Sequence, residues 1–356
     1  MAIVTLSQLK IGDKLTEPAL TKRGSLLLDK GTVILQRELD ILQAFLIPAV
    51  TIDGKREPVD VEAGKAEEAE QKVTQASPLS VEYDKLLALF RKVMFTLRSG
   101  GPLPLLEIRQ RLEALLQQSD HYNILKFTPV PFHIRDYLLH NSIMTALTSY
   151  QMARWLEMPV KDWIPVALGG LLHDIGNAKV DENILEKKGA LTHVEREEVR
   201  AHTVAGYQML KNVPGLNEGV KLSAIQHHER EDGTGYPLAV KRDKIHPYAK
   251  IIAIADTYHA MTSPRYYKQS LSPYAALEAL QAESFGKLDP ALVKLFIQKT
   301  ASFTNGTIVR LNNGQVGAIV FTDPNAPTRP WVNTNGRIVN LTSDRELYIQ
   351  EILQIS

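Results

Sequence analysis

The sequence lacks cysteine, a sizeable net charge and any long apolar run, and each absence excludes a class of site or partner. None of the 356 residues is cysteine, so disulfides, thiolate metal ligands and a cysteine nucleophile are excluded. Lysine and arginine, 41 together, almost balance the 40 aspartates and glutamates, so no global field gathers polymeric nucleic acid or an anionic membrane surface. No apolar run approaches the roughly 20 residues of a membrane helix. A cytoplasmic protein is predicted, and any metal ligands must be histidines and carboxylates.

The N-terminal part of the chain is predicted to be a small module followed by a linker. Residues 1–53 carry short apolar runs punctuated by glycines, which favours strands, with one helix expected at 37–45. Residues 54–79 are rich in Glu, Lys, Ala and Gln and have almost no large apolar side chains. Such a segment cannot bury enough apolar surface to pack, so it is predicted to be a solvated linker.

The rest of the chain is predicted to be helical and then to end in strands. From residue 80 to 302 the apolar positions recur at the spacing of one helix face. From 303 to 356 the period changes to two, and Asn313-Gly314 and Asn335-Gly336 fall where tight hairpin turns are needed. The predicted fold is therefore mainly α. It is an all-helical domain flanked by a small N-terminal α/β module and a small C-terminal antiparallel β module.

Several side chains that can bind metals lie at the ends of apolar runs. His173 and Asp174 close one predicted helix, His202 begins another, and Asp256 ends the apolar run at 251–255. Each has a structural alternative, such as a helix-end histidine hydrogen-bonded to an acid, a core histidine, or a helix-capping acid. Taken singly, these residues do not establish a metal site.

The segment 227–237, HHEREDGTGYP, carries the most specific pattern. A polar helix end running into a glycine turn explains the glycines, but not the two consecutive imidazoles of His227 and His228. Adjacent helical side chains point about 100° apart, so both rings serve one site only if they straddle a metal cluster or reach different metals. Imidazoles and carboxylates together suit borderline divalent ions.

Four motifs together resemble the HD-GYP branch of the HD superfamily. The resemblance covers roughly two-fifths of the chain, and all eight fixed positions of the eleven-residue motif are matched. The motifs are HDIG at 173–176, HxxxG at 202–206, HHExxDGxGYP at 227–237 and the segment 251–268 around Asp256.

The resemblance implies an all-helical domain that binds two or three divalent ions, usually iron or manganese. It further implies that the protein hydrolyses cyclic di-GMP to pGpG or GMP with a metal-bridged hydroxide. The implied ligands of one metal are His173, Asp174 and Asp256, and those of the next are Asp174, His202, His227 and His228. Asp174 would bridge the two metals, and it and His173 are the implied catalytic residues.

The implied substrate contacts lie outside this ligand set. Arg265 and Lys268 match the family's phosphate-facing positions, and a guanidinium and an ammonium are the expected partners of a nucleotide phosphate. Tyr236 either shapes the loop that lines the pocket or serves packing alone.

The sequence departs from the family pattern at three positions. The family's first ligand is a histidine followed by serine, and here Asn141 precedes Ser142 while His140 lies one residue early. That shift turns a helical side chain by about 100°, so which of the two occupies the ligand position is left open. The other two departures are Asn177 in place of a lysine, with Lys179 as a candidate substitute, and His259 in place of a second acid.

These departures support two hypotheses about function. In the first, the protein is a cyclic di-GMP phosphodiesterase, slowed because the first metal has lost an imidazole while the second metal keeps its full ligand set. In the second, it is a catalytically impaired sensor or interaction scaffold that retains the fold and a metal. A hydrolase acting on another nucleotide is a more distant third, against which the intact GYP loop argues. A homodimer or a protein partner that binds through the flanking β modules is left open.

Overall fold

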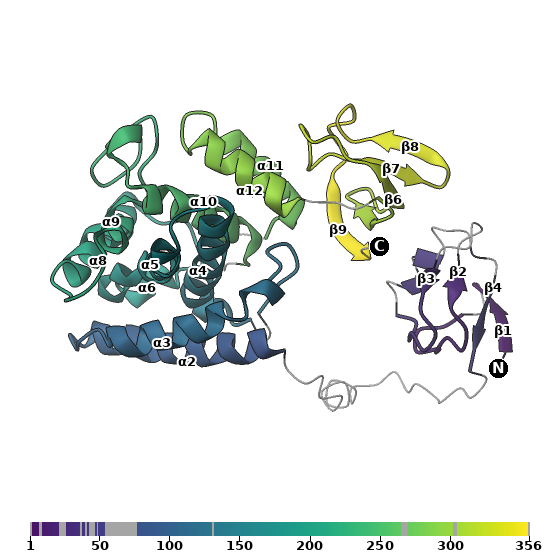
Figure 1. Ribbon diagram of the computed structural model, residues 1–356, viewed down its shortest axis with the longest axis horizontal. Coiled ribbons are helices and arrows are strands. Elements are labelled where there is room, and N and C mark those ends of the chain that lie inside the picture. The colour runs from purple at the N-terminus through teal and green to yellow at the C-terminus, as the bar shows by residue number, and fades with distance from the viewer. Residues whose placement is uncertain are drawn as a thin grey trace. The chain divides into compact units, whose positions relative to one another are not determined.

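The helices and strands of the computed structural model fall into two compact units (Figure 1). One unit combines residues 1–73 with 301–356, and the other comprises residues 74–300. The structure describes residues 2–6, 9–20, 26–35, 38, 39, 41, 42, 47, 49–53, 77–129, 132–264, 270–301 and 305–354.

The unit from 74 to 300 confirms the predicted all-helical domain. Its longer helices are α2 (Pro78–Arg98), α3 (Leu105–Leu116), α4 (Tyr137–Trp155), α5 (Val160–Leu172), α7 (His193–Arg200), α8 (His202–Leu210), α9 (Glu218–Gln226), α10 (Pro247–Thr262), α11 (Pro273–Glu283) and α12 (Pro290–Thr300). The shorter ones are α6 (Glu182–Leu185), η1 (Ser119–His121), η2 (Ile134–Asp136), η3 (Ile175–Lys179) and η4 (Arg242–Lys244).

The first and the central helices differ in how much of their surface is buried. In α2 the buried side chains recur every three or four residues, and the helix begins where the Ser77 side chain accepts a hydrogen bond from the Ser80 amide. In α4 every residue from 139 to 149 is buried, as expected of a helix surrounded by others. Helix α4 packs against α5 and α10, and α5 packs against α9. Because α4, α5, α9 and α10 pack together, polar residues near their ends can share one site.

In its described residues, the other unit contains short strands and a few helical residues. Antiparallel pairs form from β1 (Ala2–Thr5) with β4 (Ala49–Ile52) and from β2 (Ala19–Leu20) with β3 (Leu26–Leu28). A five-stranded antiparallel sheet has the order β8-β7-β6-β5-β9, from β5 (Ile308–Leu311), β6 (Val316–Phe321), β7 (Trp331–Thr334), β8 (Arg337–Asn340) and β9 (Ile349–Gln354). The hairpins predicted at Asn313-Gly314 and Asn335-Gly336 are confirmed as the β5-β6 and β7-β8 pairs.

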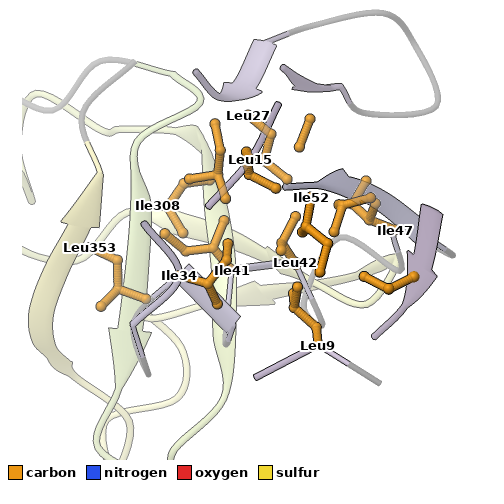
Figure 2. Close-up of a cluster of buried hydrophobic side chains, with 14 residues drawn as sticks. Leu9, Leu15, Leu27, Ile34, Ile41, Leu42, Ile47, Ile52, Ile308 and Leu353 are labelled. Carbon is orange, nitrogen blue, oxygen red and sulfur yellow. The ribbon is translucent and has the colours of Figure 1, made fainter. Parts of the chain in front are cut away.

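Side chains from both ends of the sequence share one hydrophobic cluster in this unit. Leu15, Ile34 and Ile52 from the N-terminal strands and loops lie in the same buried cluster as Ile308 and Leu353 from the C-terminal sheet (Figure 2). Each of the five is at most 4% exposed. Burial of this kind is the main stabilising term available to strands as short as these.

Some sequence predictions fall partly on residues that the structure does not describe. Of the helix expected at 37–45, residues 38, 39, 41 and 42 are described and are helical. The predicted linker lies outside the described residues from 54 to 76, whereas residues 78 and 79 belong to α2. The domain bounds drawn from the sequence stay predictions. Among the residues described, none of the helices has the length and apolar character needed to cross a membrane.

Candidate metal centre

Five of the six candidate ligands lie at or just beyond the ends of α5, α8 and α9, the sixth lies within α10, and all six meet within the helical unit. His173 ends α5 and Asp174 follows it, His202 is the first residue of α8, and His227 follows α9. His228 comes next in the chain, and Asp256 lies in α10. One ligand atom from each of Asp174, His202, His227 and His228 lies within 4.8 Å of the others.

Asp174 lies between two groups of side chains. Its Oδ1 is 3.0 Å from His202 Nε2 and 3.5 Å from His227 Nε2. Its Oδ2 is 3.5 Å from His173 Nε2, and that same nitrogen is 3.6 Å from Asp256 Oδ1. One carboxylate therefore faces a histidine cluster with one oxygen and the His173-Asp256 pair with the other, which is the arrangement that a bridging ligand requires.

Backbone carbonyls set the orientation of three of these imidazoles. The Nδ1 atoms of His173, His202 and His227 lie 2.7, 2.5 and 2.9 Å from the carbonyl oxygens of Gly170, Val199 and Ser223, respectively. A carbonyl only accepts, so each Nδ1 must donate its hydrogen. In the neutral rings this leaves the Nε2 lone pair directed at the centre of the cluster, as in metal-binding histidines.

This arrangement fits a divalent metal better than it fits hydrogen bonding alone. His202 Nε2 and His227 Nε2 are 3.3 Å apart, so in the neutral rings two lone pairs face each other. Two nitrogens that each lie about 2.0–2.1 Å from one ion would be about 3 Å apart. His173 Nε2 is buried and has no hydrogen-bond partner within the described part of the chain. One cation beside His202 and His227 and a second beside His173 would satisfy these nitrogens.

Burial and the carboxylates shift the pKa values of the cluster in opposite directions. Burial lowers the pKa of His227, and it lowers the pKa of His228 to well below the usual range. Burial acts the same way on His173, but the carboxylates of Asp174 and Asp256 outweigh it and raise its pKa to about 9. Burial raises the pKa of Asp174, but the neighbouring imidazoles outweigh that effect and hold it well below the usual range. The carboxylate is thus charged and the His227-His228 pair neutral near pH 7, the forms in which these groups bind metals.

A cavity of about 530 Å³ opens over these residues. Asp174, His202, His228 and Asp256 line it, so the candidate ligands are accessible from the cavity. Its wall also carries Tyr236 and three arginines, Arg98, Arg135 and Arg230. The arginines were missed by the sequence analysis, because none occupies a fixed position of any motif.

Comparison with known proteins identifies the family. A family model described as HD domain matches residues 108–292, which is more than half of the chain. The chain belongs to the HD domain family. Its complete HHExxDGxGYP segment places it in the HD-GYP branch, as the sequence predicted.

Curated relatives of this HD-GYP protein match it over the helical region. Cyclic di-GMP phosphodiesterase PA4108 of Pseudomonas aeruginosa is 35% identical over 185 residues, which are 52% of this chain and 44% of that protein. Cyclic di-GMP phosphodiesterase PdeB of Borreliella burgdorferi is 29% identical over 61% of this chain and 58% of its own length. The 3'3'-cGAMP-specific phosphodiesterase 3 of Vibrio cholerae is 32% identical over 43% of this chain and 33% of that protein. The chain thus spans about half the length of the first two relatives.

The structure distinguishes between the two residues considered for the first HD-GYP ligand. His140 Nδ1 lies 2.8 Å from the Tyr83 hydroxyl, and the imidazole stacks on Phe132 with ring centroids 4.6 Å apart. The Asn141 side chain lines the cavity and donates from Nδ2 to Asp256 Oδ1 over 2.6 Å. Asn141 therefore lies beside the candidate ligands, and His140 packs into the core next to α2.

The structure also shows the contacts made at the other two departures from the HD-GYP pattern, Asn177 and His259. Asn177 donates from Nδ2 to the Asp174 carbonyl over 3.1 Å, and Lys179 Nζ donates to the Leu97 carbonyl over 3.1 Å, so neither presents a charge to the cavity. His259 is buried with its Nε2 2.7 Å from the Thr148 hydroxyl, and burial lowers its pKa to about 3. A neutral histidine in that polar core does not replace a carboxylate ligand.

The loop of the GYP motif is held in place by Glu229. This buried carboxylate accepts hydrogen bonds from the Leu238 amide over 2.7 Å and the Val240 amide over 3.1 Å. A Cβ atom on Gly235 would lie 2.4 Å from the Arg230 amide nitrogen, so only glycine fits there. Tyr236 then stacks on His228 with ring centroids 4.7 Å apart. From the sequence, Glu229 and Gly235 are motif positions without an assigned role, and in the structure they position this loop.

Of the three predicted substrate-binding residues, the structure describes Tyr236. Arg265 and Lys268 lie outside the described residues. Tyr236 lines the cavity, with the Arg200 guanidinium 4.9 Å from the centre of its ring. Its contacts with both His228 and Arg200 show that packing is at least part of what it does.

Proposed function

We propose that this chain is a metal-dependent phosphodiesterase that hydrolyses cyclic di-GMP to pGpG, GMP or both, in the cytoplasm. The proposal rests chiefly on the position of Asp174 between two sets of metal-competent side chains at the wall of a cavity. The names of the relatives PA4108 and PdeB support the choice of substrate, since both are called cyclic di-GMP phosphodiesterases.

Each group in the site has a part in this proposal. His173, Asp174 and Asp256 would hold one divalent ion, iron or manganese, and Asp174, His202, His227 and His228 would hold the second. Such a pair of ions supplies an activated water near neutral pH and neutralises charge on the phosphoryl group. The backbone carbonyls fix the imidazoles, which limits reorganisation during turnover. Arg265 and Lys268 are proposed to contact phosphate, and Tyr236 to form part of the nucleotide pocket.

The experiment that tests this function is a hydrolysis assay on anaerobically purified protein with its metal content counted. Cyclic di-GMP should be consumed, with pGpG or GMP separated by chromatography, and activity should disappear with a chelator and return with Fe²⁺ or Mn²⁺. The same assay with 3'3'-cGAMP tests the specificity that the Vibrio cholerae relative's name describes for that protein. Metal-loaded protein that hydrolyses neither dinucleotide would exclude the enzyme proposal.

A second function, that of a catalytically impaired sensor or scaffold, is supported by one specific observation. The Asn141 amide donates to Asp256 Oδ1 over 2.6 Å, so the first metal position has an amide where the family has an imidazole. On this alternative the protein binds one metal and the dinucleotide without turnover. Tight binding of cyclic di-GMP by protein that shows no hydrolysis would establish it.

A further inference from the structure

The cavity lacks a cation at the position where the family pattern has a lysine. Asn177 is neutral and folds back onto the Asp174 carbonyl, with 3.1 Å between donor and acceptor. Lys179, two residues later, donates a hydrogen bond from Nζ to the Leu97 carbonyl, also over 3.1 Å. Neither residue of this segment can therefore contribute a positive charge to a bound phosphate.

The same Lys179 bond fixes the end of α2 against this segment. Leu97 is buried, and the next residue, Arg98, is the last of α2 and lines the cavity together with Asp174 and Asn177. Helix α2 packs against η3, the short helix that contains both Asn177 and Lys179. The guanidinium of Arg98 is thus held beside Asn177, the position where the family pattern has a lysine. Arg98 lies before residue 108, where the match to the family model begins, so no family motif points to it.

The carboxylate that forms an ion pair with Arg98 can be displaced by another anion. Its guanidinium forms an ion pair with Glu182, whose side chain is 65% exposed, whereas that of Arg98 is 30% exposed. An ion pair with so exposed a carboxylate contributes little to stability, so the carboxylate can turn to solvent when another anion arrives. The Arg98 Nε is buried and has no hydrogen-bond partner among the described residues. A phosphate can accept from Nε and a terminal nitrogen together, as a guanidinium prefers.

We propose that Arg98 binds a phosphate of the cyclic dinucleotide in place of the missing lysine, and that Glu182 competes with the phosphate for it. This inference rests on the proposed function, because it names a substrate contact in the same cavity. Arg135 and Arg230 are weaker candidates. Arg135 is exposed, and the Arg230 terminal nitrogen already lies 3.4 Å from the Glu229 carbonyl.

The test compares Arg98→Gln, Glu182→Gln and the double variant in metal-loaded, full-length protein. Arg98→Gln should raise the Kd and the KM for cyclic di-GMP by about 10- to 100-fold, the usual effect of losing a charge-assisted hydrogen bond. Metal content and kcat should change little, because the contact is made in the ground state as well. Glu182→Gln should tighten binding by removing the competitor. In the double variant the tighter binding caused by Glu182→Gln should disappear, because it depends on Arg98.

A matched control and a rescue separate this role from a general effect of charge. Arg109→Gln removes an arginine from neighbouring α3 that also pairs with a glutamate, Glu113, at 2.8 Å but lies outside the cavity. Its Kd should equal that of the wild type. Adding Asn177→Lys to Arg98→Gln should restore binding, because it returns a cation to the same wall. An unchanged Kd in Arg98→Gln would overturn the inference. The inference would also be overturned if Glu182→Gln tightened binding of the dinucleotide equally in the presence and absence of Arg98.

The inference can be judged even if the proposed function is wrong. Wild-type protein that neither binds nor hydrolyses cyclic di-GMP or 3'3'-cGAMP would refute the function. In that case the Kd for inorganic phosphate is measured in the wild type and in the Arg98→Gln and Arg109→Gln variants. Weaker phosphate binding in Arg98→Gln alone would support an anion site at Arg98. Equal phosphate binding in all three proteins would refute it.

Discussion

Asn141 donates from Nδ2 to Asp256 Oδ1, the same carboxylate oxygen that lies 3.6 Å from His173 Nε2. The amide therefore occupies the oxygen that a metal shared by His173 and Asp256 would use. An amide is also a poorer ligand than an imidazole for borderline divalent ions. Asn141 thus weakens metal binding at the first position in two ways. It lacks the imidazole ligand, and its amide competes with the metal for Asp256 Oδ1.

Replacement of Asn141 by histidine should increase metal content and hydrolysis together. An imidazole there restores a ligand and removes the amide donor, so the number of ions per chain should rise toward two and kcat should rise by about tenfold or more. The measurement is metal analysis and single-turnover hydrolysis of cyclic di-GMP on the same preparation. His140→Phe is the matched control, because His140 packs against Tyr83 and Phe132, and it should leave metal content unchanged. Wild-type protein that already binds two ions would show that Asn141 or a water completes the first site.

Asp174→Asn should reduce metal binding at both positions. The carboxylate faces His202 and His227 with Oδ1 and His173 with Oδ2, so no other single change removes charge from both sides. Metal affinity should fall by roughly 10- to 100-fold or more, and hydrolysis should fall with it. The control is Asp181→Asn, which alters the exposed acid that caps α6. Retention of one tightly bound ion in Asp174→Asn would show that Asp174 is not shared.

The metal-free protein should lose stability as the pH rises from about 6.5 to 9. Burial opposes the charge on His173, but Asp174 and Asp256 outweigh it and raise its pKa from 6.5 to about 9. A raised folded-state pKa stabilises the protein fully below the unfolded value of 6.5, and this contribution is lost as the pH passes through the folded value. The free energy of unfolding of chelator-treated wild type should therefore decrease over this window relative to His173→Gln. Parallel pH profiles for the two proteins would show that the His173 imidazolium does not stabilise the fold.

The sequence predicted the helical domain and the candidate ligands for different physical reasons. Apolar spacing marks helices such as α2 because their buried side chains recur on one face. The histidines of 227–237 could be singled out because no packing role requires two adjacent imidazoles. Arg98 could not be found this way, because it lies before the motifs and reaches the cavity only through the packing of α2 on η3. The choice between His140 and Asn141 likewise depended on the exact rotation of α4, which periodicity does not determine.

The glycine of the HDIG motif should be essential for positioning His202. A Cβ atom on Gly176 would lie 1.9 Å from the His202 carbonyl oxygen and 2.5 Å from the Gly206 amide nitrogen. These are backbone atoms of α8, so no side chain can move aside and the helix itself must shift. Gly176→Ala should lower the free energy of unfolding by about 1–3 kcal/mol, the usual cost of overpacking. Because His202 belongs to the shifted backbone, metal affinity should fall as well.

Gly189→Ala is the matched control for this change. A Cβ atom on Gly189 meets nothing within 4 Å, so the alanine there should leave both the free energy of unfolding and metal affinity close to wild type. Denaturant unfolding of the metal-free proteins measures stability, and titration with Mn²⁺ measures affinity. If Gly176→Ala loses stability but binds Mn²⁺ as tightly as Gly189→Ala, then α8 can shift without moving the His202 imidazole. The close contact between Gly176 and α8 would then serve packing alone.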